Sequence, residues 1–314
     1  MNDPLVWHGH ANGKLLLSAE YFVLDGAVAI GLPCKLGQSL RVTEGPEAGR
    51  LSWTSQAVDG TVWFECELEA GDFAIRQSTD EETALRLQGV FRAIRQLQPE
   101  LTFSPQGLHF NTRLEFDRSW GLGTSSTLLY LLSQWAKVDP FALLPRTFGG
   151  SGYDIAAAAM NQPFYYRTGE PPEYWPSDFQ PPFKDQLYFV YLGRKQNSRD
   201  GIARYRSRKK KQLKELVLEI SKLSINLPKA TDLLTFEAVI QAHESMVASV
   251  VDLERVQTRY FSDYWGQTKS LGAWGGDFIL VTSDRTSAET RAYFNEKGYE
   301  VFLKYEDLIL DNPL

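Results

Sequence analysis

Residues 120–127 combine the chemistry that a bound phosphate group requires. They read Trp-Gly-Leu-Gly-Thr-Ser-Ser-Thr, follow a predicted strand and open a predicted helix. Glycines permit a tight turn and a close approach of the backbone to a ligand. The first turn of a helix presents free N–H groups and a partial positive charge, and four adjacent hydroxyl side chains add donors and a candidate magnesium ligand. The alternative is a glycine turn followed by a serine cap.

Two further glycine clusters accompany this loop. Residues 149–154 (Gly-Gly-Ser-Gly-Tyr-Asp) precede an alanine-rich segment, and residues 269–277 (Lys-Ser-Leu-Gly-Ala-Trp-Gly-Gly-Asp) precede a predicted strand. Alone, the first is consistent with a capping aspartate and the second with a turn. Together with Gly13-Lys14 they form a more specific constellation. Dinucleotide, Walker, nucleophile-elbow and His-Glu-x-x-His signatures do not fit the sequence.

Composition narrows the class of protein. The 314 residues carry a net charge of −6, so a nucleic-acid-binding surface is not expected. The two cysteines, Cys34 and Cys66, are too few for a disulfide framework or a four-thiolate zinc site, and we expect free thiols. The N-terminus lacks the blocks of a signal peptide, and no run of 18 apolar residues occurs. These features predict a cytoplasmic protein that does not bind membranes.

The elements that must position these motifs are mixed. Strands are followed by alternating helices and strands, which predicts an α+β fold. A proline-rich stretch, residues 163–185, reads as a loop and a domain junction. The expected strands are 37–44, 61–68, 108–116, 186–192, 277–282 and 299–304. The expected helices are 80–98, 125–137, 154–160, 200–223, 235–256 and 287–297.

In three places, and in the same order, the sequence resembles the GHMP kinases, named for galactokinase, homoserine kinase, mevalonate kinase and phosphomevalonate kinase. Their first motif resembles residues 11–21 (Ala-Asn-Gly-Lys-Leu-Leu-Leu-Ser-Ala-Glu-Tyr), their second resembles 117–126, and their third is similar to 272–276. The Gly-Tyr-Asp-Ile-Ala stretch at 152–156 is similar to a bacterial subgroup and to phosphomevalonate kinases. The sequence is identified as a member of this superfamily.

The resemblance implies a two-domain fold. A half like domain 2 of ribosomal protein S5 would span residues 1–165, and a ferredoxin-like half would span residues 166–314. It further implies ATP, Mg²⁺ and a small-molecule acceptor as ligands, and homodimer formation is compatible with it. The implied reaction is transfer of the γ-phosphoryl group to a small alcohol or phosphate.

The resemblance also assigns roles to individual residues. Asp154 would accept or orient the proton of the acceptor, and Lys14 would keep Asp154 ionised and offset charge on the transferred group. The residues expected to bind ATP phosphates are Gly121, Leu122, Gly123, Thr124, Ser125 and Ser126. Other residues are expected to contact the substrate or to belong to a phosphate loop. They are Gly272, Ala273, Gly275, Gly276, Glu20, Lys195, Ser198 and Arg199.

Some positions depart from the family pattern. Asp117 stands where proline is usual, and Trp274 replaces a small glycine and is expected to narrow the cleft. Between Thr127 and Tyr153 there is no glutamate to hold magnesium, so Ser125 is the metal ligand that the sequence offers.

The acceptor is predicted to be phosphomevalonate or mevalonate. Lys195, Arg199 and the basic run 204–211 suit an anionic acceptor, although a basic run is also typical of a solvated helix face. Homoserine and sugars remain alternatives. A nucleotide-binding relative without catalysis, a decarboxylase relative and, last, a basic-patch RNA binder also stay open.

Overall fold

The computed structural model describes residues 5–103, 106–194, 198–208, 210–272, 274 and 276–311. These residues form two compact units, and neither is contiguous in the sequence. Unit 1 contains residues 5–13, 36–118 and 122–159, and unit 2 contains 14–35, 119–121 and 160–311. Segments 14–35 and 119–121 therefore pack with the C-terminal part of the chain, although a division at residue 165 would place them in the N-terminal half. No helix in the described part of the chain is long and apolar enough to cross a membrane.

A twisted mixed sheet forms one layer of unit 1. In it β2 is antiparallel to β6, β6 is parallel to β3, and β3, β4 and β5 continue as antiparallel neighbours. Two strands, β1 and β2, begin in one unit and end in the other. The strands that contribute to this unit are β1 (Leu5–Leu16), β2 (Ala29–Glu44), β3 (Arg50–Gln56), β4 (Val62–Glu69), β5 (Ile75–Ser78) and β6 (Leu108–Leu114).

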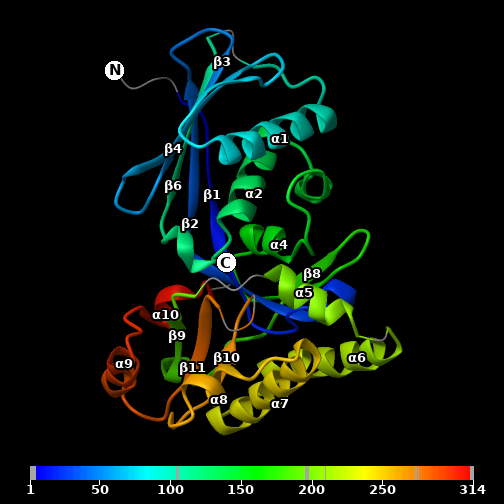
Figure 1. The fold of residues 1–314 in the computed structure, drawn as a ribbon, viewed down its shortest axis with the longest axis vertical. Coiled ribbons are helices and arrows are strands. Elements are labelled where there is room, and N and C mark those ends of the chain that lie inside the picture. The colour runs from blue at the N-terminus through cyan, green and yellow to red at the C-terminus, as the bar shows by residue number, and fades with distance from the viewer. Residues whose placement is uncertain are drawn as a thin grey trace. The chain divides into compact units, whose positions relative to one another are not determined.

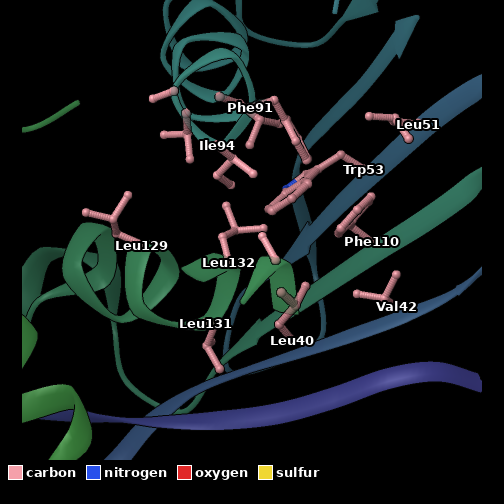
Figure 2. Packing of buried hydrophobic residues seen from close by; sticks show 14 of the residues in the cluster. Leu40, Val42, Leu51, Trp53, Phe91, Ile94, Phe110, Leu129, Leu131 and Leu132 are labelled. Carbon is pink, nitrogen blue, oxygen red and sulfur yellow. The ribbon is translucent and has the colours of Figure 1, made fainter. Parts of the chain in front are cut away.

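Helices cover one face of this sheet and enclose an aromatic core. Trp53 of β3 stacks on Phe110 of β6 and meets Phe91 of α1 edge to face. Figure 2 shows these rings between the strands and the leucines of α2. Because aromatic side chains bury large areas, this cluster supplies much of the stability of unit 1. The helices are α1 (Glu81–Leu97), α2 (Thr124–Ala136), α3 (Pro140–Leu143) and α4 (Tyr153–Ala159).

Unit 2 is built on a second, fully antiparallel sheet in the order β10-β11-β9-β12. All five residues of β11 are buried, as expected for a strand covered on both faces. Helices α6 and α7 pack side by side in this unit (Figure 1). The strands are β9 (Leu187–Tyr191), β10 (Thr268–Ser270), β11 (Phe278–Thr282) and β12 (Phe302–Lys304). The helices are α5 (Ser198–Arg206), α6 (Lys210–Asn226), α7 (Leu233–Val251), α8 (Val256–Tyr260), α9 (Ser287–Glu296) and α10 (Tyr305–Leu308).

Two expectations about elements were wrong. The single helix expected over 200–223 is divided into α5 and α6, and between them the Arg208 guanidinium donates hydrogen bonds to the carbonyls of Ser249 and Val250 at the end of α7. The proline-rich stretch contains two strands, β7 (Phe164–Arg167) and β8 (Glu173–Pro176), which pair with each other. Because β8 is exposed throughout and ends its sheet, its proline at position 176 is tolerated there.

Candidate functional site

The glycine-rich loop leads into α2 as the sequence predicts. Gly121 (φ 68°) and Gly123 (φ 97°) both adopt left-handed conformations, which favour glycine. Gly123 is the N-cap of α2, and no side chain caps the helix there. The Ser126 hydroxyl donates to the Gly123 carbonyl at 2.8 Å, whereas Ser125 is exposed. The first turn of α2 thus has no side-chain cap on its N–H groups, the arrangement that suits an anion.

In unit 1 the loop lies beside the first motif. A Cβ at Gly13 would come within 2.7 Å of the Leu36 carbonyl oxygen and 3.3 Å of the Leu122 carbonyl oxygen. Only glycine fits there without displacing backbone. Inside α2, the Thr127 hydroxyl lies 2.7 Å from Gln38 Oε1 of β2, so the helix start is bonded to the sheet.

In unit 2 the other end of the loop is held by aromatic residues. The Trp120 ring packs on Tyr191 and Phe278, and the Tyr191 hydroxyl donates to the Ser119 carbonyl at 2.9 Å. A Cβ at Gly121 would overlap the carboxylate of Asp277. The structure therefore brings Gly121 of the second motif against the last residue of the third glycine-rich segment.

Lys14 and Asp154 belong to different units. Lys14 is partly buried near the end of β1 in unit 2. There its charge opposes the effect of burial, which raises the pKa of the Cys34 thiol. Asp154 is the second residue of α4 in unit 1 and is partly buried; it follows Gly149, Gly150 and Gly152, all with positive φ. The pairing expected between Lys14 and Asp154 stays a prediction.

Glu20 occupies a different environment from the one expected of a ligand-binding residue. Its carboxylate has no exposed surface and accepts a hydrogen bond from Lys269 Nζ. Burial raises its pKa from 4.5 to about 7; the nearby Glu244 carboxylate adds to this rise, whereas Lys269 opposes it. The two residues on either side, Ala19 (φ 62°) and Tyr21 (φ 65°), adopt left-handed conformations that are unusual outside glycine.

The structure describes only part of the third motif. Gly272 has φ 61°, Gly276 is buried, and Trp274 (φ 54°) is 1% exposed. Its indole N–H donates to Glu244 Oε1 at 3.0 Å, so its ring is held inside unit 2. It also borders a cavity of about 210 Å³ between Arg194 and α8. Ala273, Gly275 and Lys195 lie outside the described residues, and Ser198 and Arg199 begin α5.

Sequence reasoning did not assign four of the residues in these surroundings. Lys269 and Asp277 appeared only as the two ends of the 269–277 segment, and His243 and Glu244 belonged to no motif. The one signal in α7 was the adjacent pair His243-Glu244 inside a largely apolar helix. In the described part of the chain, no group of three or more His, Cys, Asp or Glu side chains could hold a metal ion.

Comparisons with known proteins place the fold. No family model and no curated protein matches the sequence. Among solved structures, mevalonate kinase from Methanococcus jannaschii matches with a TM-score of 0.70 and 14% identity over 98% of each chain. Streptococcus pneumoniae phosphomevalonate kinase, in complex with phosphomevalonate and AMPPNP, has the same TM-score and identity over 95% of this chain and 100% of that one.

A galactokinase shares the architecture less closely. The Lactococcus lactis enzyme, complexed with galactose, matches with a TM-score of 0.61 and 11% identity over 95% of this chain and 92% of that one. At identities this low, the TM-scores and coverages show the architecture of the chain and nothing more specific. Together with the α+β composition and the two-unit organisation, they confirm the expectation raised by the three glycine-rich motifs: the chain has the GHMP kinase fold.

Proposed function

We propose that the chain is an ATP-dependent kinase that transfers the γ-phosphoryl group to a mevalonate-type acceptor, either phosphomevalonate or mevalonate. The observation that carries the proposal is the start of α2, where two left-handed glycines precede a helix with no side-chain cap. Phosphate oxygens are the natural partners of such N–H groups. The fold is the one seen in kinases with mevalonate, phosphomevalonate and galactose ligands.

In this proposal the residues divide the work of phosphoryl transfer, which is mostly positioning and charge stabilisation. The backbone of residues 121–126 binds the β- and γ-phosphates. Asp154 accepts the proton of the acceptor hydroxyl or orients its oxygen, and Lys14 offsets the charge that builds up on the transferred group. The exposed hydroxyl of Ser125 would help to hold a Mg²⁺ ion bound with the nucleotide, and that ion would neutralise phosphate charge.

Two features support an anionic acceptor. The strand β9 leads into α5 through Arg194, and α5 carries exposed arginines at 204 and 206. Cationic side chains along one segment favour a carboxylate or phosphate over a neutral sugar. The structural matches include complexes with R-mevalonate and with phosphomevalonate. Homoserine or a sugar is the alternative acceptor, in keeping with the galactokinase match.

The test is an ADP-release assay with mevalonate, phosphomevalonate, homoserine and galactose. We expect turnover with one of the first two, and a fall of at least ~10²-fold in kcat in Asp154→Asn and in Lys14→Ala. Matched controls are Asp178→Asn and Lys222→Ala, which change exposed side chains of unit 2. Both controls should keep native turnover.

Other outcomes would redirect the assignment. ATP binding without turnover on any acceptor would indicate a relative that has lost catalysis, and carbon dioxide release from diphosphomevalonate would indicate a decarboxylase. Native turnover in Asp154→Asn or Lys14→Ala would refute the roles given to these two residues.

A further inference from the structure

Four polar side chains, none of them exposed, meet in the interior of unit 2. They are Glu20, from the first motif; His243 and Glu244, from α7; and Lys269, from β10. Lys269 Nζ donates to Glu20 and lies 3.2 Å from Glu244 Oε1. We call these four residues the buried polar cluster.

The cluster is joined by direct hydrogen bonds to the unit 2 part of the first motif and to the segment 269–277. The Ala19 N–H donates to His243 Nε2 at 2.8 Å, which fixes the imidazole as an acceptor at that nitrogen. Glu244 accepts from the Trp274 indole N–H at 3.0 Å and from the Ser270 hydroxyl at 3.0 Å. The first motif is thus held through His243 and Lys269, and the third through Glu244.

Backbone strain coincides with these bonds. Three of the six non-glycine residues with positive φ in the described part of the chain are Ala19, Tyr21 and Trp274. Ala19 and Trp274 are hydrogen-bonded to members of the cluster, and Tyr21 follows Glu20, which is itself a member. Strained conformations persist only where the surroundings over-determine them, and they gather where geometry matters for function. A glycine would relieve the strain at Trp274 but would lose the bond to Glu244.

Stability alone is a poor reason for such a cluster. Two carboxylates and one ammonium sum to −1 when all are ionised, and each loses its hydration on burial. Replacing buried ion pairs with apolar residues is often neutral or stabilising, and in some proteins such groups instead specify one defined geometry. The cluster is therefore better suited to fixing two backbone segments than to strengthening the core.

We propose that the buried polar cluster is a positioning unit, which holds the backbone of Ala19–Tyr21 and the side chain of Trp274 in the arrangement that phosphoryl transfer requires. This inference rests on the proposed kinase function. None of the four residues contacts a substrate in this view, and Glu20 acts through the segment that it anchors. Trp274 likewise serves as an anchor, rather than as a wall that narrows the cleft.

The test compares a disruptive and a conservative variant at each of two positions. His243→Leu removes the acceptor of the Ala19 N–H, whereas His243→Gln can present an amide oxygen. Glu244→Leu removes the acceptor of the Trp274 indole, whereas Glu244→Gln retains one. The exposed Glu219→Leu on α6 is the control.

Hydrogen exchange without ligand is the first readout. We expect His243→Leu to speed exchange at least ~10-fold in peptides covering residues 17–23, and Glu244→Leu to do so over 268–277, with both glutamine variants close to native. Kinetics, measured well below the melting temperature of each variant, are the second readout. We expect kcat to fall about 10-fold in each leucine variant and to stay close to the native value in the glutamine variants. A purely structural role would lower the melting temperature and leave kcat unchanged.

The outcomes are decisive in both directions. Unchanged exchange in the leucine variants, or faster exchange with native kcat, overturns the proposal. If a leucine variant does not fold, Trp274→Phe, which keeps a buried ring and removes the indole donor, takes its place with the same readouts. If the native protein releases no ADP with any acceptor, the proposed function fails, and hydrogen exchange alone then decides whether the cluster holds the two segments.

Discussion

Replacing Glu20 with glutamine should change how the stability of the protein depends on pH. In the folded protein burial raises the pKa of Glu20 from 4.5 to about 7, so between these values the native state holds a proton that the unfolded chain has released. The free energy of unfolding therefore falls as the pH rises through this window. The displaced pKa corresponds to a loss on the order of 3 kcal/mol across the window.

Glutamine is neutral at every pH and keeps an oxygen that can accept from Lys269. We therefore expect Glu20→Gln to match the native protein near pH 4.5, where Glu20 is protonated, and to exceed its stability by up to about 3 kcal/mol above pH 7.5. Urea unfolding at half-unit pH steps from 4.5 to 8 measures the difference. Glu219→Gln, in an exposed pair with Lys222, is the control and should follow the native curve. Parallel curves for Glu20→Gln and the native protein would refute the reasoning.

Two further variants test the loop and the core. Gly121→Ala should destabilise unit 2 by about 1–3 kcal/mol and weaken binding of a non-hydrolysable ATP analogue at least ~10-fold in calorimetry, because its φ is 68° and its methyl would overlap Asp277. Gly60→Ala, also at positive φ but with no atom within 4 Å of its Cβ, should lose stability without losing nucleotide. Trp53→Ala should cost about 3–5 kcal/mol in urea unfolding, because it empties the aromatic core of unit 1; a loss below 1 kcal/mol would contradict that packing.

Local signals predicted the long helices better than the strands, because β1, β3, β5 and β10 are not among the strands that the sequence led us to expect. Asp80 accepts from the Thr83 N–H and caps α1, which runs from Glu81 to Leu97 where a helix was expected over 80–98. The glycine-rich loop before α2 was likewise predicted, because turns and helix caps depend on residues that are only a few positions apart in sequence. The strands inside the proline-rich stretch were missed because their pairing depends on partners elsewhere, including Ala29–Gly31 of β2.

The buried polar cluster could not be predicted, because its bonds join residues far apart in sequence. Glu20 and Lys269 are separated by 249 positions, and Ala19 and His243 by 224. A lysine in a strand and a glutamate on a helix are usually solvated. Their burial follows from the packing of segment 14–35 into unit 2, and no periodic pattern in the sequence predicts that burial.

The interleaving of the two units has a consequence for dissecting the protein. The chain passes between them five times, at 13/14, 35/36, 118/119, 121/122 and 159/160. No single cleavage therefore releases one unit whole. A fragment ending at residue 165 would carry segment 14–35 without Lys269, His243 and the helices that bury it, and the complementary fragment would expose the cavity left behind. Gene-splitting and domain-exchange designs should accordingly transfer segments 14–35 and 119–121 together with the C-terminal part of the chain.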